Sequence, residues 1–238
     1  MNDQNPLVGF DGIARLFPLP NFVMMPHVVK GFNIFEQRYR EMTADALADD
    51  QLITLVLPKP GWEADYDGKP ALHDVACLTR ILTHKKLPDG RFDLLLHGVC
   101  RVRIHDELLA KTLYRQVRVE ALPDALGKEP PSLRRGLRDA VRPWLPRQKG
   151  AMAQFNALMG SDKPLGALCD IIAFALGLPP EIKQLLLETL DVPQRADLLI
   201  HSLKAARAEP QVAETSGAAP EQLPMPRERR FPPDFSIN

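Results

Sequence analysis

The segment 75–107 constrains the fold of this chain more than any other. It reads VACLTRILTHKKLPDGRFDLLLHGVCRVRIHDE, two long strand-like runs on either side of LPDG at 87–90. Proline and aspartate in the central positions, followed by glycine, are typical of a type I turn, so the two runs are predicted to pair as a β-hairpin. Gly98 then interrupts the alternation of the second run. A glycine at such a point indicates a bulge, which curves a sheet toward a barrel.

Other strand-like stretches surround this hairpin. Short apolar runs broken by proline or glycine lie at 13–19 and 27–35, and an aliphatic run suited to a buried strand lies at 51–57. The stretch 113–122 supplies one more alternating pattern. We therefore predict a β domain over residues 13–123.

From about residue 124 the apolar period becomes helical. Three helices are predicted between 165 and 207, because Gly177 follows the first apolar stripe, Pro180 opens the second and Asp191 is placed to cap the third. Residues 124–207 are thus predicted to form a helical bundle, and the fold class is α+β. Residues 208–238 contain six prolines and little apolar periodicity, so this tail is predicted to be disordered. A short docking motif in RERRFPPDFSIN is the alternative.

The sequence FNIFEQRYREM at 32–42 gathers charged and aromatic residues, and it raises the question of a catalytic cluster. On a helix that starts near Ile34, one face is predicted to be apolar and buried, and it comprises Phe35, Tyr39, Met42 and Ala46. Glu36 and Arg40 are four residues apart and are expected to pair on the outer surface. The sequence indicates neither a pocket nor a partner that would shift the pKa of a carboxylate, so the cluster is interpreted as structural.

Charge and cysteine content narrow the function classes. The 30 basic and 30 acidic side chains cancel, although residues 111–150 hold ten Lys and Arg against four Asp and Glu. The three cysteines lack the spacing of a disulfide framework or a zinc site, and the histidines form no paired-ligand motif, so neither a metal nor another cofactor is expected. The N-terminus does not have the pattern of a signal peptide, and no long uncharged apolar window predicts a membrane span. A soluble cytoplasmic protein is expected.

Four motifs, in this order, resemble the N-terminal substrate-binding domain of Lon proteases. They are LFPLPNFVMMP, FNIFEQRYREM, LPDGRFDLLLHGVCRVRI and YRQVRVEALPD. The resemblance continues through the predicted helices and covers roughly residues 13–206. It implies a PUA-like β pseudo-barrel with a short helix, followed by a helical bundle.

The resemblance also sets expectations for activity. Lon proteases follow this region with an ATPase module and a Ser-Lys protease domain, whereas this sequence ends 31 residues beyond Arg207 and contains neither a phosphate-binding GxxxxGK[ST] loop nor a GxSxG elbow. We therefore expect a stand-alone, non-catalytic module that binds unfolded or specific polypeptides. A role as an adaptor or regulator in protein quality control, with a complete Lon protease as a partner, is a further expectation.

Two candidate binding sites follow from these hypotheses. An exposed peptide groove is predicted at the apolar run between Pro20 and Pro26, which comprises Phe22, Val23, Met24 and Met25. The alternative is that this run packs in the core. The competing functional hypothesis is RNA binding through the basic stretch 111–150, with contacts from Arg115, Arg118, Arg134 and Arg135. Aromatic residues for base stacking are few in that stretch, so nucleic acid is the less favoured partner.

Overall fold

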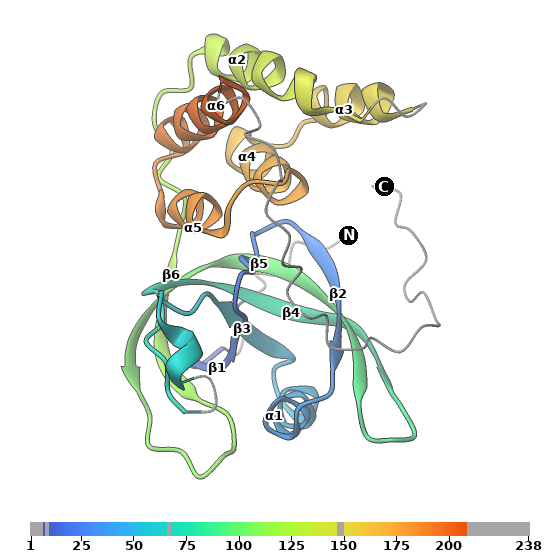
Figure 1. The fold of residues 1–238 in the computed structure, drawn as a ribbon, viewed down its shortest axis with the longest axis vertical. Coiled ribbons are helices and arrows are strands. Elements are labelled where there is room, and N and C mark those ends of the chain that lie inside the picture. Colours follow the sequence, from blue (N-terminus) through green and yellow to red (C-terminus); the bar gives the residue numbers. More distant parts are fainter. Residues whose placement is uncertain (1–6, 8–9, 66–67, 147–149, 209–238) are drawn as a thin grey trace, which may run out of the picture.

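The computed structural model describes residues 7, 10–65, 68–146 and 150–208, and it consists of a curved sheet beneath a layer of helices (Figure 1). Within these residues the strands form one sheet in the order β2-β5-β4-β3-β1-β6. Their bounds are β1 Ile13–Pro18, β2 Val29–Ile34, β3 Leu52–Val56, β4 Val75–Lys86, β5 Phe92–Glu107 and β6 Gln116–Leu122. Because β5 also pairs with β6, strands β1, β3, β4, β5 and β6 close into a barrel and β2 stays at the edge. This is the pseudo-barrel that the resemblance implied.

The predicted hairpin is confirmed as the antiparallel pair β4 and β5. Gly90 in its turn has a φ of +84°, a conformation that favours glycine. The predicted bulge is confirmed as well, because the register shifts between Leu78 and Thr79, whose partners are Cys100 and Gly98. The bulge comes with a close approach of another segment. A Cβ atom at Gly98 would lie 2.0 Å from the carbonyl oxygen of Met25, so only glycine fits there without a shift of the backbone.

Apolar residues fill two cores, one on each face of the sheet. The core inside the barrel contains Ala14, Leu16, Leu52, Val56, Ala76, Leu78, Val102, Val117 and Val119. The larger core lies on the other face and joins the sheet to helix α1, Gln37–Ala48, and to the helical bundle.

Helix α1 differs from its prediction at the start. Tyr39, Met42 and Ala46 are buried as expected, but Phe35 is 64% exposed. The helix begins at Gln37 with Glu36 as its N-cap, so Phe35 precedes the helical period and does not share the buried face. Glu36 pairs with Arg38, at 2.8 Å between the carboxylate and the guanidinium, rather than with Arg40.

The bundle contains the predicted helices at 165–207 as α4 Leu165–Ala175, α5 Pro180–Glu188 and α6 Val192–Ala208. The carboxylate of Asp191 accepts a hydrogen bond from the amide of Gln194 at 2.8 Å, the cap expected from the sequence. Upstream lie α2 Pro131–Val141 and α3 Ala151–Met159, and the short 3-10 helices are η1 Trp62–Asp65 and η2 Arg142–Trp144. Of the tail predicted to be disordered, 208–238, Ala208 is the last residue of α6, and residues 209–238 lie outside the described part of the chain.

Candidate functional site

The peptide groove predicted from the sequence is not exposed. It comprised Phe22, Val23, Met24 and Met25. The last three of these residues are at most 4% exposed and belong to the larger core, whereas Phe22 is half-buried. The ring of Phe22 lies edge-on to that of Phe174 in α4, with the ring centroids 5.9 Å apart. The expectation of an exposed groove is therefore wrong, and the alternative of packing in the core is confirmed. The physical reason is that this loop crosses the β5 bulge and lies between the sheet and the bundle.

The four arginines proposed to contact nucleic acid do not gather in one patch. Arg115 forms an ion pair with Glu107 at 2.9 Å, and Arg118 is exposed on β6. Arg134 donates a hydrogen bond to the carbonyl of Lys163, and Arg135 is exposed on α2. Figure 1 shows β6 within the sheet and α2 at the far end of the bundle. The basic stretch is thus divided between two parts of the molecule.

A buried ion-pair network connects the sheet to the bundle. Arg101 of β5 donates two hydrogen bonds to the carboxylate of Asp170 in α4, at 2.9 and 2.6 Å. These side chains are 3% and 1% exposed, respectively. The Nε atom of Arg101 also donates to the carbonyl of Leu187, at the end of α5, at 2.8 Å. Burial opposes the charge of Arg101, but the nearby carboxylates outweigh burial and raise its pKa.

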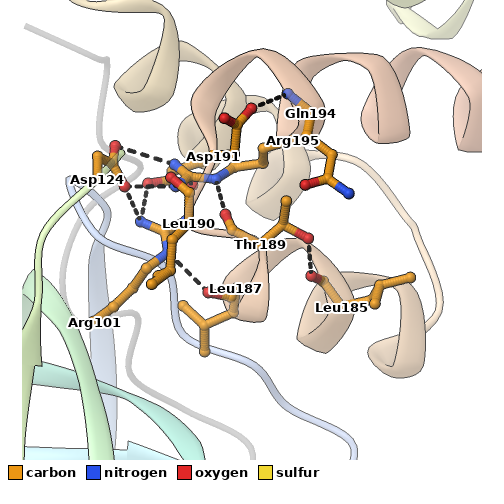
Figure 2. Close-up of polar contacts among 10 residues, drawn as sticks. Arg101, Asp124, Leu185, Leu187, Thr189, Leu190, Asp191, Gln194 and Arg195 are labelled. Atoms are coloured by element: carbon orange, nitrogen blue, oxygen red, sulfur yellow. Dashed lines mark hydrogen bonds and ion pairs between the residues drawn. The ribbon is translucent and has the colours of Figure 1, made fainter. Parts of the chain in front are cut away.

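A second arginine completes this network. Arg195 of α6 contacts Asp124, in the segment between β6 and α2, at 2.5 Å, and its Nε atom donates to the carbonyl of Thr189 at 2.8 Å (Figure 2). Its Nη1 atom lies 3.4 Å from Asp170, so each carboxylate contacts both guanidinium groups. Two cations and two anions balance each other, and backbone carbonyls accept further hydrogen bonds. This arrangement is a structural connection, because all four charged groups already have partners.

The sequence contained a signal for this network that the helical and strand patterns obscured. Asp170 stands inside the apolar run LCDIIAFA, and Arg195 lies one residue before Ala196 of a buried stripe. A charged residue in a buried register requires a partner of opposite charge. Pairing such residues across elements would have identified the contact between the two parts.

The described residues also contain a groove at the open end of the barrel, with a volume of about 340 Å³. It lies between the end of β1, the start of α1 and the segments around 58, 68–70 and 107–115. Its apolar lining includes Leu16, Leu108, Leu113, Pro18, Pro58 and Pro70.

Residues 108–115 form one wall of this groove, and acidic residues of α1 hold this wall in place. Glu41 accepts a hydrogen bond from the amide of Leu113 at 3.1 Å, and Asp45 accepts one from the hydroxyl of Tyr114 at 2.7 Å. Burial, together with Asp45, raises the pKa of Tyr114 to about 12, so the phenol stays protonated and keeps donating. Helix α1, through Glu41 of the FNIFEQRYREM motif and through Asp45 beyond it, therefore holds one wall of the groove.

The same wall exposes apolar side chains. Leu113, which lines the groove, is half-exposed, and Leu109 of the same segment is fully exposed beside the lining. The charged groups of the groove are paired, as in the contacts of Glu107 with Arg115 and Lys69. Among the described residues, no group of three or more His, Cys, Asp or Glu side chains is arranged to hold a metal ion. The groove therefore offers apolar contact bordered by compensated charge.

Comparison with known proteins assigns this architecture to a family. Residues 13–205 match the ATP-dependent protease La (LON) substrate-binding domain. The chain belongs to this family.

Relatives and solved structures agree with the assignment. The chain is 29% identical to Lon protease 2 of Myxococcus xanthus over 198 residues, which are 82% of this chain and 24% of that protein. It is 31% identical to the Lon protease of Syntrophus aciditrophicus over 206 residues, 82% of this chain and 25% of that protein. The chain thus spans about a quarter of the length of these relatives.

Two solved structures show the same fold. The N-terminal domain of the Mycobacterium avium complex Lon protease superposes with a TM-score of 0.63 at 18% identity, covering 81% of this chain and 98% of that one. The Lon N-terminal domain protein from Xanthomonas campestris gives a TM-score of 0.60 at 20% identity, covering 79% and 97%. The predicted α+β class is confirmed. In the part of the chain that the structure describes, no helix has the length and apolar character needed to cross a membrane.

Proposed function

We propose that this chain is a non-catalytic polypeptide-binding module, and that the groove at the barrel opening binds apolar segments of unfolded chains. One observation carries this proposal. Leu113 lines the groove, and the neighbouring Leu109 extends the exposed apolar surface of a wall whose backbone and tyrosine are fixed to α1 by hydrogen bonds. A fixed wall lowers the entropy that binding must overcome, because the apolar contacts exist before the ligand arrives.

Membership in a substrate-binding domain family supports a polypeptide as the ligand. Exposed apolar patches of soluble proteins mark interaction sites, and each Å² of apolar surface covered contributes about 25 cal/mol. A groove of this size contacts only a few side chains at once, so we expect affinity for many unfolded sequences and strong selectivity for none. Such a module suits an adaptor or regulator that presents polypeptides to a complete Lon protease in the cytoplasm.

A binding experiment tests the groove directly. The probe is fluorescein-labelled, reduced and carboxymethylated α-lactalbumin, which stays unfolded, and the readout is fluorescence anisotropy. The groove variant combines Leu109→Asp with Leu113→Asp. The matched control combines Leu126→Asp with Leu185→Asp, two exposed leucines outside the segment 108–115 that forms the groove wall, and it adds the same charge.

The groove variant is expected to lose at least about tenfold in affinity, which is roughly 1.4 kcal/mol. The control should bind like the original chain. Equal affinities of the groove and control variants would reject the groove as the binding site.

A further inference from the structure

The outer edge of β2 is a second surface suited to an extended chain. Within the described residues β2 pairs with β5 only. The amide of Gly98 donates to the carbonyl of Val28 at 2.8 Å, which sets the alternation of the antiparallel ladder. By that alternation Lys30 and Phe32 exchange hydrogen bonds with β5, whereas the backbone groups of residues 29, 31 and 33 point away from the sheet.

The side chains along this edge leave room for another strand. Phe32 and Ile34 pair with the inward residues of β5, whereas Val29 is 44% exposed on the outer face. Gly31 pairs with Leu95 of β5 and has no side chain of its own. If a further strand pairs with β2, its residue opposite Gly31 can place a side chain on the outer face of the sheet. Because Gly31 has no side chain, that side chain reaches the half-buried Leu95.

The charge around the outer edge of β2 indicates which kind of chain can pair with it. Lys30 of β2 and Lys85 and Lys86 of the adjoining hairpin are exposed, whereas Arg91 forms an ion pair with Asp89 at 2.7 Å. Asp93 accepts a hydrogen bond from the side chain of Asn33, so the exposed lysines leave an excess of positive charge beside this edge. A second copy paired through this edge would bring two positive surfaces together, whereas an acidic segment is attracted to it.

We propose that the outer edge of β2 binds an extended acidic polypeptide segment as an additional strand, with a large apolar side chain opposite Gly31. Main-chain hydrogen bonds to residues 29, 31 and 33 supply the recognition, and the side chain against Leu95 supplies the register. This inference rests on the proposed function in that the ligand is a polypeptide, but it assigns that ligand to a surface separate from the groove.

Alternate N-methylation of a peptide tests the backbone pairing on the unmodified chain. The probe is the fluorescein-labelled peptide DVTFTVD. One modified form carries N-methyl groups on both valines and the phenylalanine, and the other carries them on both threonines. Amides of alternate residues point to the same side of a strand, so only one form blocks the side that faces β2.

One methylated peptide is expected to lose at least about tenfold in affinity, and the other should stay within about threefold of the original. If the two methylated peptides have the same affinity, whether both bind or both fail to bind, the peptide does not pair with β2 as an added strand. Replacing both aspartates of the probe by lysine should weaken binding, and unchanged binding would overturn the charge argument.

A variant separates the edge from the groove. Gly31→Pro removes an outward N–H and blocks the approach of a strand, and proline is tolerated at sheet edges. This variant should lose DVTFTVD but keep its circular dichroism spectrum, whereas Leu109→Asp with Leu113→Asp should still bind the peptide.

The reverse pattern would place the peptide in the groove and overturn the edge site while leaving the proposed function intact. Dimers of the original chain in sedimentation velocity that Gly31→Pro dissolves would assign the edge to a second copy and also overturn the inference.

Discussion

Two regions of the molecule place residues against their usual preference for burial or exposure, and they do so in opposite ways. One is the contact between the sheet and the bundle, and the other is the groove at the barrel opening. The first buries charged groups, with Arg101 and Asp170 almost fully enclosed, and the second exposes leucines such as Leu109. Buried charges are tolerated only when each finds a partner, so changes there should alter stability. An exposed leucine contributes little to folding and is available to a ligand. The comparison separates the part of the molecule that stabilises the fold from the part that is proposed to bind polypeptides.

The largest effect is expected from Asp170→Ala, which leaves Arg101 and Arg195 buried with Asp124 as their remaining carboxylate partner. Loss of one partner of a buried pair costs about 3–5 kcal/mol, so the free energy of unfolding in urea should fall by that amount. The control is Arg101→Met with Asp170→Leu, which removes both charges of the closest pair and should cost less than the single change. A loss below about 1 kcal/mol for Asp170→Ala would contradict the structural importance of the network.

A second large effect is expected where the peptide groove was first predicted. Met25 is fully buried and its carbonyl oxygen lies against Gly98, so Met25→Ala should lower the free energy of unfolding by about 2–5 kcal/mol. Leu126→Ala, at a residue that is 79% exposed, is the control and should change it by less than about 0.5 kcal/mol. If Met25→Ala leaves stability unchanged, the loop does not pack as described.

Local sequence patterns predicted the strands and helices, but they did not predict which distant parts of the chain pack against them. The turn at 87–90, the bulge beside Gly98, the proline that opens α5 and the cap of α6 depend on neighbouring residues, so the sequence indicated them. The burial of residues 22–25 depends on a bundle more than a hundred residues away, and no local signal distinguishes such a run from an exposed one. The groove is harder still to predict, because it is assembled from separate segments and is held by contacts from Glu41 and Asp45.

A smaller effect is expected in alkali, and it belongs to the buried side of the comparison. Burial first, and then Asp170, raise the pKa of Cys169 to about 12, above the ordinary thiol value near 9. The folded chain therefore keeps the neutral thiol where the unfolded chain ionises. The contribution of this thiol is complete below about pH 9 and is lost as the pH rises toward 12, by up to about 1.4 kcal/mol per pH unit.

Urea unfolding at pH 8 and pH 10.5 measures this loss. Cys169→Ala should show a shallower decline than the original chain between these two values, whatever its stability at pH 8. A residual decline is expected, because burial raises the pKa of Cys77 and of Tyr114 as well. Identical slopes in the two chains would show that Cys169 ionises as readily in the folded state as in the unfolded one.

The smallest effect on stability is expected at the groove wall, and it completes the comparison. Leu109 is fully exposed, so Leu109→Asp should change the free energy of unfolding by less than about 0.5 kcal/mol. The same substitution should weaken binding of unfolded α-lactalbumin, because it places a carboxylate where apolar surface meets the ligand. If Leu109→Asp binds normally, or if it is strongly destabilised, the proposed separation of a stabilising interior contact from a binding surface is wrong. Leu109→Met keeps the apolar surface and should preserve both properties, which ties the effect to apolar contact rather than to any change at this position.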